Sequence, residues 1–191
     1  MNVRNERKLI LLSKIFISQF RKIRNLYYSY TFSTSKLRVG SSGVFSGTKN
    51  ITFGKNVLLG NFFWLESHKD GKIYIGDDVS FSSNIHIASS VEVFISSGCL
   101  VGSDVLITDH SHSYGMKYFD ILPKYRKVTS KGKTVLGSNC WICDNVKILS
   151  GVNLGSNVVV AANSVVTQSF PDNVVIGGIP ARVLKENINE S

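Results

Sequence analysis

The stretch from residue 136 to residue 166 reads LGSNCWICDNVKILSGVNLGSNVVVAANSVV. An aliphatic residue returns in it at every sixth position, namely at Leu136, Ile142, Ile148, Leu154, Val160 and Val166. A period of six fits neither an α-helix nor an ordinary strand, whose periods are about 3.6 and 2 residues. It predicts a parallel β-helix, in which each hexapeptide forms one short strand and one corner and three hexapeptides form one coil.

The corners have their own signal within this period. Three residues after most of the aliphatic positions stands a turn-former, in the order Asn139, Asn145, Gly151, Asn157 and Asn163. Asn and Gly adopt positive φ more readily than other residues, which suits a tight corner. The same period recurs earlier in shifted frames, at Val39, Phe45 and Ile51, at Phe53, Leu59 and Leu65, at Ile75, Phe81 and Ile87, and at Ile95, Val101 and Ile107. An all-β sandwich is the alternative, but its strands do not recur at six.

Composition places the chain among globular proteins. It has 191 residues, of which 43% are hydrophobic and 18% are charged, enough for one domain with a real core. The net charge is +9, and residues 1–38, with nine basic groups and one acidic group, carry +8 of it. The remaining residues have no basic face to form a groove, so we expect no nucleic acid partner.

Three cysteines, Cys99, Cys140 and Cys143, occur in the chain. The repeat explains Cys140 as a small core residue, so the C-x-x-C spacing favours neither a redox nor a zinc site. The first apolar run is interrupted by Lys14 and lacks a small-residue cleavage site, and no uncharged apolar run of about 18 residues is present. We therefore expect reduced thiols, no membrane span and a cytoplasmic location.

Residues 5–28 have helical spacing and belong to a basic N-terminal unit, residues 1–38. An apolar stripe is formed by Leu9, Leu12, Ile15, Phe16, Phe20, Ile23, Leu26 and Tyr27. Two roles remain open for this amphipathic helix. It caps the open first coil and packs on it, or it makes peripheral contact with an anionic membrane surface.

The end of the repeat, GSNCWICDNVKILSGVNLGSNVVVAANSVVTQSFPDNVVIGGIPARVLK (residues 137–185), resembles the maltose, galactoside and polysaccharide O-acetyltransferases. The likeness to this hexapeptide-repeat superfamily extends over roughly residues 39–187. It implies an all-β, left-handed parallel β-helix, although parallel crossovers are otherwise right-handed. It also implies acetyl-CoA as co-substrate without a metal, a homotrimer with active sites between subunits, and a sugar hydroxyl as acceptor. The resemblance implies an acceptor in surface polysaccharide biosynthesis and leaves open whether that glycan is free, nucleotide-linked or lipid-linked.

Transfer of acetyl from a thioester to a hydroxyl needs a general base, and histidine suits that role near neutral pH. Of the four histidines, His110 falls three residues after Ile107, in the corner position of the repeat. His112 falls where the repeat stops. In relatives the catalytic histidine lies at such an exit and opens a His-x-hydrophobic motif, which His112-Ser113-Tyr114 matches. The resemblance thus favours His112 as base, with His110 as second candidate and Asp109 as the residue that orients either.

Residues 113–133 interrupt the solenoid with an irregular loop. A connection of this length is usually functional. We expect it to protrude, cover the acceptor site and reach toward a neighbouring subunit. The alternative is a plain surface excursion.

The resemblance also indicates binding residues. On the acceptor side Asn84 matches a family asparagine, Ser82 stands where relatives have Asn, and Trp141 borders the site. On the donor side Trp141 lines the pantetheine tunnel and Ala162 and Thr167 let backbone groups meet the CoA arm. Gln168 replaces a common lysine at this position. Arg182 and Lys185 are expected to contact the phosphates of the nucleotide end.

Functions of other classes are also compatible with this repeat. A streptogramin-type antibiotic acetyltransferase would share fold and donor, and a non-catalytic β-helix scaffold would share the fold alone. A zinc hydratase on the same helix needs three histidines, including a His-x-x-x-x-His pair. That pair is absent from the sequence.

Overall fold

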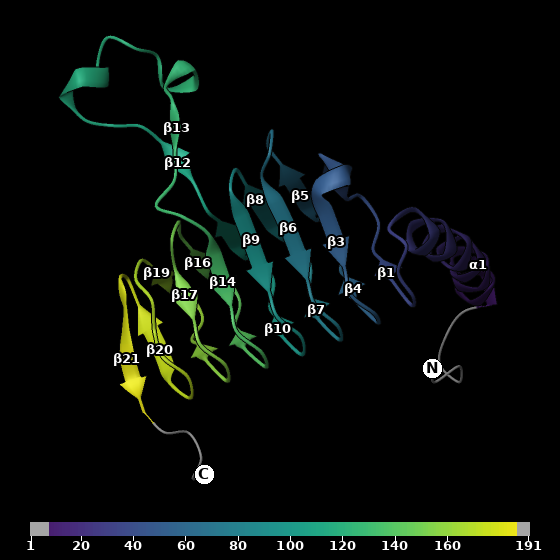
Figure 1. Ribbon diagram of the computed structural model, residues 1–191. Coiled ribbons are helices and arrows are strands. Elements are labelled where there is room, and N and C mark those ends of the chain that lie inside the picture. Colours follow the sequence, from purple (N-terminus) through teal and green to yellow (C-terminus); the bar gives the residue numbers. More distant parts are fainter. Residues whose placement is uncertain (1–7, 187–191) are drawn as a thin grey trace.

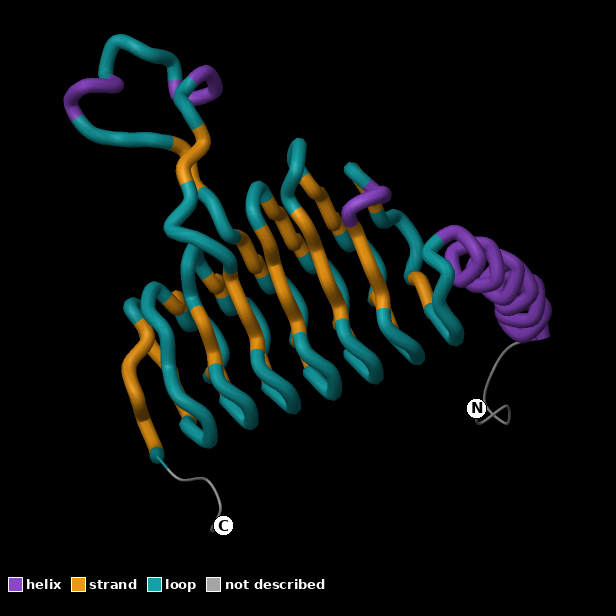
Figure 2. The backbone as a smooth tube through the Cα atoms, in the orientation of Figure 1, coloured by secondary structure: helices purple, strands orange, loops and turns teal. Residues whose placement is uncertain are grey.

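The computed structural model describes residues 8–186. The chain winds into a stack of flat-sided coils with a helix at one end and an antiparallel hairpin at the other (Figure 1). One long excursion leaves the stack from its side (Figure 2). The predicted parallel β-helix with an N-terminal helix and a protruding loop is therefore confirmed.

Three sheets form the sides of the stack, and we name them faces A, B and C. Face A contains β1 (Arg38–Val39), β4 (Leu58–Leu59), β7 (Ser80–Phe81), β10 (Leu100–Val101), β15 (Trp141–Ile142), β18 (Val159–Val160), β20 (Val175–Gly178) and β21 (Ala181–Lys185). Face B contains β2 (Val44–Ser46), β5 (Trp64–Ser67), β8 (His86–Ser89), β11 (Leu106–Thr108), β16 (Lys147–Ile148) and β19 (Val165–Val166). Face C contains β3 (Ile51–Phe53), β6 (Lys72–Ile75), β9 (Glu92–Ile95), β14 (Thr134–Leu136) and β17 (Asn153–Leu154).

The protruding excursion begins and ends with a short antiparallel ribbon. Its strands are β12 (Ser111–His112) and β13 (Val128–Thr129). Two 3-10 turns, Met116–Tyr118 and Pro123–Tyr125, lie at its tip, and a third, Thr48–Asn50, precedes β3. The ribbon lifts the tip away from the coils (Figure 2).

The aliphatic residues that recur every six positions point inward and form the core. They stack on their counterparts one coil away, as Ile107 does on Ile87 and Ile148. All six aliphatic residues of the stretch 136–166 are at most 1% exposed. The predicted corner residues, from Asn139 to Asn163, have φ between 57° and 79°, in the left-handed region. Both halves of the repeat pattern are thus confirmed.

The α1 helix (Lys8–Thr31) covers the open edge of the first coil. The side-chain oxygen of Asn25 accepts a hydrogen bond from the N–H of Val39 at 3.0 Å, and the hydroxyl of Ser29 accepts one from the N–H of Leu37 at 3.2 Å. Arg24 donates to the carbonyl of Val39 at 2.5 Å. These bonds satisfy strand-edge groups that no further coil pairs. Of the two roles left open by the sequence, capping is the one the structure shows.

Most of the apolar stripe whose side chains the structure describes is exposed to solvent. Phe16, Phe20, Ile23 and Leu26 are each more than half exposed. These four side chains therefore lie outside the capping contact, whereas Tyr28, nearer the end of the helix, packs against the core. None of the helices between residues 8 and 186 is long and apolar enough to cross a bilayer.

Candidate active site

A buried polar group lies where the chain leaves face B for the protruding ribbon. The Nδ1 atom of His110 lies 2.9 Å from Oδ1 of Asp109. The Asp109 side chain is fully buried, and that of His110 is only 13% exposed. Because a carboxylate only accepts hydrogen bonds, Nδ1 carries the proton and Nε2 keeps its lone pair. An imidazole in this tautomer is prepared to accept a proton at Nε2.

Asp109 is itself fixed by the preceding coil. Its carboxylate accepts hydrogen bonds of 2.8 Å from the Ser89 hydroxyl and from the backbone N–H groups of Ser90 and Val91. Burial by itself would raise the pKa of Asp109, but the hydrogen bonds from His110, Ser90, Val91 and Ser89 outweigh it and lower the pKa. The carboxylate therefore stays ionised while buried next to the imidazole.

The chain around His110 departs from the repeat. His110 stands three residues after the inward-facing Ile107, as Asn84 stands after Phe81 and Asp104 after Val101, but of these three only Asn84 and Asp104 have positive φ. The expectation that His110 occupies an ordinary corner is wrong, because the chain turns outward here into β12. The Asp109 carbonyl anchors this exit by accepting hydrogen bonds of 2.5 Å from the hydroxyls of Ser130 and Ser150.

His112 has different surroundings. It lies in β12, paired with Val128 of β13, and its side chain is exposed. Its Nδ1 atom is 3.4 Å from the carbonyl oxygen of Arg126, a long contact to an uncharged group. Among residues 8–186, no carboxylate forms an ion pair with this ring.

The residues expected on the donor side lie on other parts of the stack. Trp141 points outward from face A and is half exposed. Ala162 precedes the corner residue Asn163 between faces A and B. Arg182 and Lys185 lie exposed on β21 at the end of face A. Thr167 and Gln168 follow β19 on the B–C side, as His110 follows β11, but two strands further along face B. Among the predicted site residues within 8–186, Asp109 and His110 are the two whose side chains form a hydrogen bond with each other.

Asn84 and Ser82, two of the three residues expected on the acceptor side, are separate from His110 as well. Asn84 has φ 59° at a corner between faces A and B, and its amide donates to the carboxylate of Asp104 in the next coil. Similar side-chain pairs link corners elsewhere, such as Asn145 to Asn163 at 2.8 Å. Asn84 thus takes part in a corner ladder.

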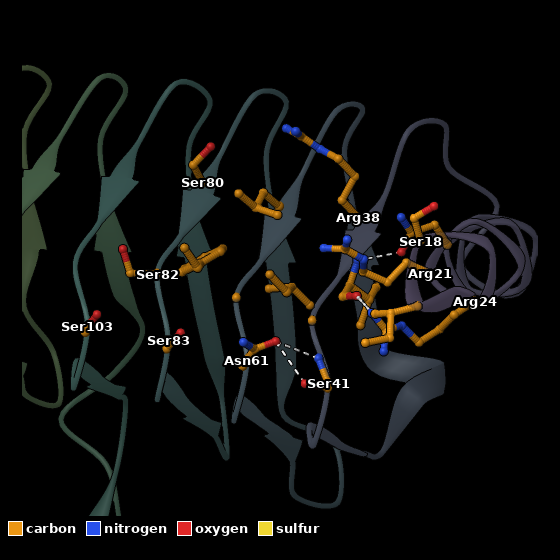
Figure 3. A pocket seen from close by; sticks show the side chains of 18 of the residues that line it. Ser18, Arg21, Arg24, Arg38, Ser41, Asn61, Ser80, Ser82, Ser83 and Ser103 are labelled. Atoms are coloured by element: carbon orange, nitrogen blue, oxygen red, sulfur yellow. Dashed lines mark hydrogen bonds between the residues drawn. The ribbon is translucent and has the colours of Figure 1, made fainter. Parts of the chain in front are cut away.

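Ser82 borders a groove of about 990 Å³ between α1 and face A. Figure 3 shows Arg21 and Arg24 of α1 and Arg38 of β1 around this groove, with Ser82 and Ser103 further along it. Lys22 also lines it, and no carboxylate does within the described part of the chain. The groove is therefore a cationic depression rich in hydroxyl groups.

A second group of side chains was not predicted from the sequence. Glu66, His68 and His86 gather on face B, where Nε2 of His86 lies 2.9 Å from Oε1 of Glu66. Trp64 stacks on His86. The two strands pair across a 22-residue step (Trp64 with His86), whereas the neighbouring step from His86 to Leu106 is 20 residues. Unequal coil lengths hide this alignment from a search for a fixed period.

The described residues contain no candidate metal site. No group of three or more His, Cys, Asp or Glu side chains with an arrangement that could hold a metal ion occurs between residues 8 and 186.

Comparisons with known proteins agree with the repeat. Residues 133–168 match the family described as "Bacterial transferase hexapeptide (six repeats)". The chain is 38% identical over 147 residues to an Escherichia coli (strain K12) protein, WbbJ, whose name assigns it to lipopolysaccharide biosynthesis as an O-acetyl transferase. That alignment covers 74% of each chain. The chain is also 30% identical over 119 residues to the galactoside O-acetyltransferase of the same organism, in an alignment that covers 60% of this chain and 54% of the relative.

Among solved structures, AntD, an N-acyltransferase from Bacillus cereus in complex with dTDP and 3-hydroxybutyryl-CoA, superposes with a TM-score of 0.72. The match covers 85% of this chain and 87% of AntD at 20% identity, which establishes a shared fold. With the sequence identity to WbbJ extending over three quarters of both chains, the protein belongs to the hexapeptide-repeat acetyltransferase family.

Proposed function

We propose that the protein transfers an acetyl group from acetyl-CoA to a hydroxyl group of a sugar in surface polysaccharide biosynthesis. The observation that carries this proposal is the buried Asp109 carboxylate against Nδ1 of His110. We assign the general base to His110, and His112, favoured by the sequence motif, becomes the second candidate. The assignment rests on the ionised partner that His110 has and on the weak contact of His112 to a carbonyl group.

The reaction follows from this arrangement. Nε2 of His110 accepts the proton of the acceptor hydroxyl while its oxygen attacks the thioester carbonyl of acetyl-CoA. The tetrahedral intermediate collapses, the C–S bond breaks, and the imidazolium returns the proton to the CoA thiolate. Asp109 stabilises the imidazolium between these steps and holds the ring in one tautomer. The products are the acetyl ester and free CoA.

The donor site is proposed to lie between subunits of a homotrimer. Trp141, Arg182 and Lys185 lie on face A, whereas His110 leaves from the junction of faces B and C. A second copy of the chain that lays face A beside this junction would complete the site. In that arrangement Trp141, Ala162, Thr167 and Gln168 line the pantetheine arm, and Arg182 and Lys185 contact the phosphates. The protruding loop 113–133 covers the acceptor and reaches the neighbouring subunit.

On the acceptor side, Asn84 and Ser82 keep the roles expected from the resemblance as proposals. The corner ladder of Asn84 leaves its side-chain carbonyl available to a hydroxyl, because only its amide N–H is used by Asp104.

We also propose that α1 holds the enzyme on the inner face of a membrane, within the cytoplasm. Phe16, Phe20, Ile23 and Tyr27 recur at intervals of three and four and form an exposed apolar face. Arg21, Lys22 and Arg38 line the groove between α1 and face A, and their positive charge suits anionic headgroups. Such a location fits a lipid-linked glycan acceptor.

The experiment is a transfer assay with ¹⁴C-acetyl-CoA, in which the acceptors are methyl hexosides, amino sugars and a streptogramin antibiotic. Label in an alkali-labile ester of a neutral sugar supports the proposal. Label in an alkali-stable amide assigns an N-acetyltransferase, label in the antibiotic assigns a drug-modifying enzyme, and no CoA binding by calorimetry assigns a scaffold.

A further inference from the structure

The outer face of the coil stack beside His110 carries an unusual row of side chains. Trp64 and Glu66 lie in β5, His68 follows the end of that strand, and His86 lies in the neighbouring strand β8 of face B. Trp64 pairs directly with His86, and Glu66 and His68 follow Trp64 at intervals of two, so all four side chains lie on the same side of the sheet. The four residues form what we name the face B row.

Glu66 links the row together. Its Oε1 atom lies 2.9 Å from Nε2 of His86 and 3.7 Å from Nε2 of His68, and its side chain is only 14% exposed. Because the carboxylate only accepts, the Nε2–H of His86 donates to it, and Nδ1 of His86 is left with a lone pair. Within residues 8–186 this Nδ1 atom has no hydrogen-bond partner. A largely buried carboxylate and two partly exposed imidazoles thus present unused acceptors and donors to solvent.

The row is continuous with the proposed base. The ring of His68 meets the ring of His110 edge-on, with 5.4 Å between the ring centroids. At the other end, the indole of Trp64 stacks on His86 with 4.6 Å between centroids, and 47% of Trp64 is exposed. A ligand that lies on Trp64 and Glu66 therefore extends toward His110.

Aromatic stacking alone does not distinguish a ligand site on this fold. Tyr74 and Phe94 stack in the same way on face C, at 4.5 Å between centroids. Paired positions on neighbouring strands bring any two aromatic rings into such contact. The face B row differs because it combines an exposed indole with a carboxylate shared by two histidines and ends at His110.

We propose that Trp64, Glu66, His68 and His86 form one subsite of the acceptor site and that this subsite takes the pyranose ring of an uncharged sugar. This inference rests on the proposed function, which makes His110 the base. The C–H face of the pyranose lies on the apolar indole, while Glu66 and the imidazoles bind its hydroxyl groups. The Glu66 carboxylate repels a sugar that carries a carboxylate of its own, so uronic acids bind more weakly than neutral sugars.

The binding experiment uses the intrinsic fluorescence of Trp64. The chain has two tryptophans, so Trp141→Phe leaves Trp64 as the one indole. We expect saturable quenching by methyl β-D-galactopyranoside or methyl β-D-glucopyranoside, about tenfold weaker binding of the glucuronide, and about tenfold weaker binding of neutral glycosides after Glu66→Gln. No quenching by either neutral glycoside, or equal affinity for the glucuronide, overturns the inference.

Kinetics supply the second test, with the neutral acceptor that gives the highest turnover. Trp64→Ala and Glu66→Gln are expected to raise the acceptor KM about tenfold and leave the KM for acetyl-CoA within about twofold. Tyr74→Ala is the matched control, because it removes an equivalent stack on face C, and its acceptor KM should equal that of the wild type. An unchanged acceptor KM in Trp64→Ala and Glu66→Gln contradicts the subsite.

Failure of the proposed function has a different signature. In that case wild-type protein releases no CoA with any sugar, or His110→Ala retains full turnover, while the fluorescence titration still reports whether the face B row binds a glycoside.

Discussion

Oδ1 of Asp109 lies 2.9 Å from Nδ1 of His110, and both oxygens of that carboxylate are also bonded to the coil before it, through Ser89, Ser90 and Val91. The coils of the solenoid therefore fix the Asp109 carboxylate, and the carboxylate in turn fixes the orientation of the His110 imidazole. Asp109 acts through His110, so it is a positioning residue.

Asp109→Asn should lower kcat by a factor on the order of 100 or more, because the amide can donate to Nδ1 and favour the wrong tautomer. Ser89→Ala, which removes one of the carboxylate's hydrogen bonds, should have a smaller effect in the same direction. Steady-state kinetics with both substrates saturating measure this, and a wild-type kcat in Asp109→Asn would contradict the positioning role.

Asp109 also predicts a pH dependence of stability. Its pKa is lowered in the folded protein, so its contribution is present above the ordinary value of about 3.9 and is lost as the pH falls through the lower folded pKa. The difference in unfolding free energy between wild type and Asp109→Asn should be constant above about pH 5 and shrink below about pH 4. Urea unfolding between pH 3 and pH 7 tests it, and a difference that grows toward acid would refute it.

The two candidate bases can be separated by substitution. His110→Ala should lower kcat by about 10²- to 10⁴-fold, the usual effect of removing a general base. The kcat of His112→Ala should stay within about threefold of the wild-type value. The His112 side chain is exposed on the ribbon and has no ionised partner within residues 8–186, so it is not prepared to act as the base. Circular dichroism and the elution volume serve as folding controls. The reverse ranking would return the base to His112.

Mixing two inactive variants tests the shared site. His110→Ala and Trp141→Ala subunits, unfolded together and refolded at equal amounts, should regain about a quarter of wild-type turnover if each site takes one residue from each neighbour in a trimer. In random assembly, three quarters of the trimers contain both variants, and each of those trimers has one intact site out of three. Refolding each variant alone is the control, and no recovery on mixing would place both residues in one subunit.

The helix cap predicts a loss of stability. Asn25→Ala leaves the N–H of Val39 without its acceptor, and a buried unsatisfied donor costs about 1–3 kcal/mol. Gln19→Ala on the exposed side of α1 is the control and should change stability by less than about 0.5 kcal/mol. Hydrogen exchange at residues 37–39 together with urea unfolding measures both. Equal protection in the two variants would show that α1 is not the cap.

Membrane contact is tested by vesicle sedimentation. The wild type should sediment with vesicles of phosphatidylglycerol and phosphatidylcholine but not with phosphatidylcholine alone, because the basic side chains of α1 need anionic headgroups. The triple variant Phe16→Ser, Phe20→Ser and Ile23→Ser should remain in the supernatant. Equal sedimentation of the variant would assign binding to charge alone, and no sedimentation of the wild type would remove the proposal.

The sequence by itself determined the scaffold. The aliphatic residues that recur every six positions from Leu136 predicted core-facing strands, and the turn-formers that recur from Asn139 predicted corners. The stacked coils confirmed both predictions. This prediction is local, because each hexapeptide carries its own strand and corner.

Only the tertiary structure decided the site. Asp109 meets the backbone of Ser90 and Val91 because two coils lie side by side, and Glu66 meets His86 for the same reason. Those coils differ in length, so residues that touch across them stand at unequal separations along the chain. The repeat therefore predicted a corner at His110, whereas the outward turn into β12 and the buried carboxylate beside it exist only once the coils are stacked.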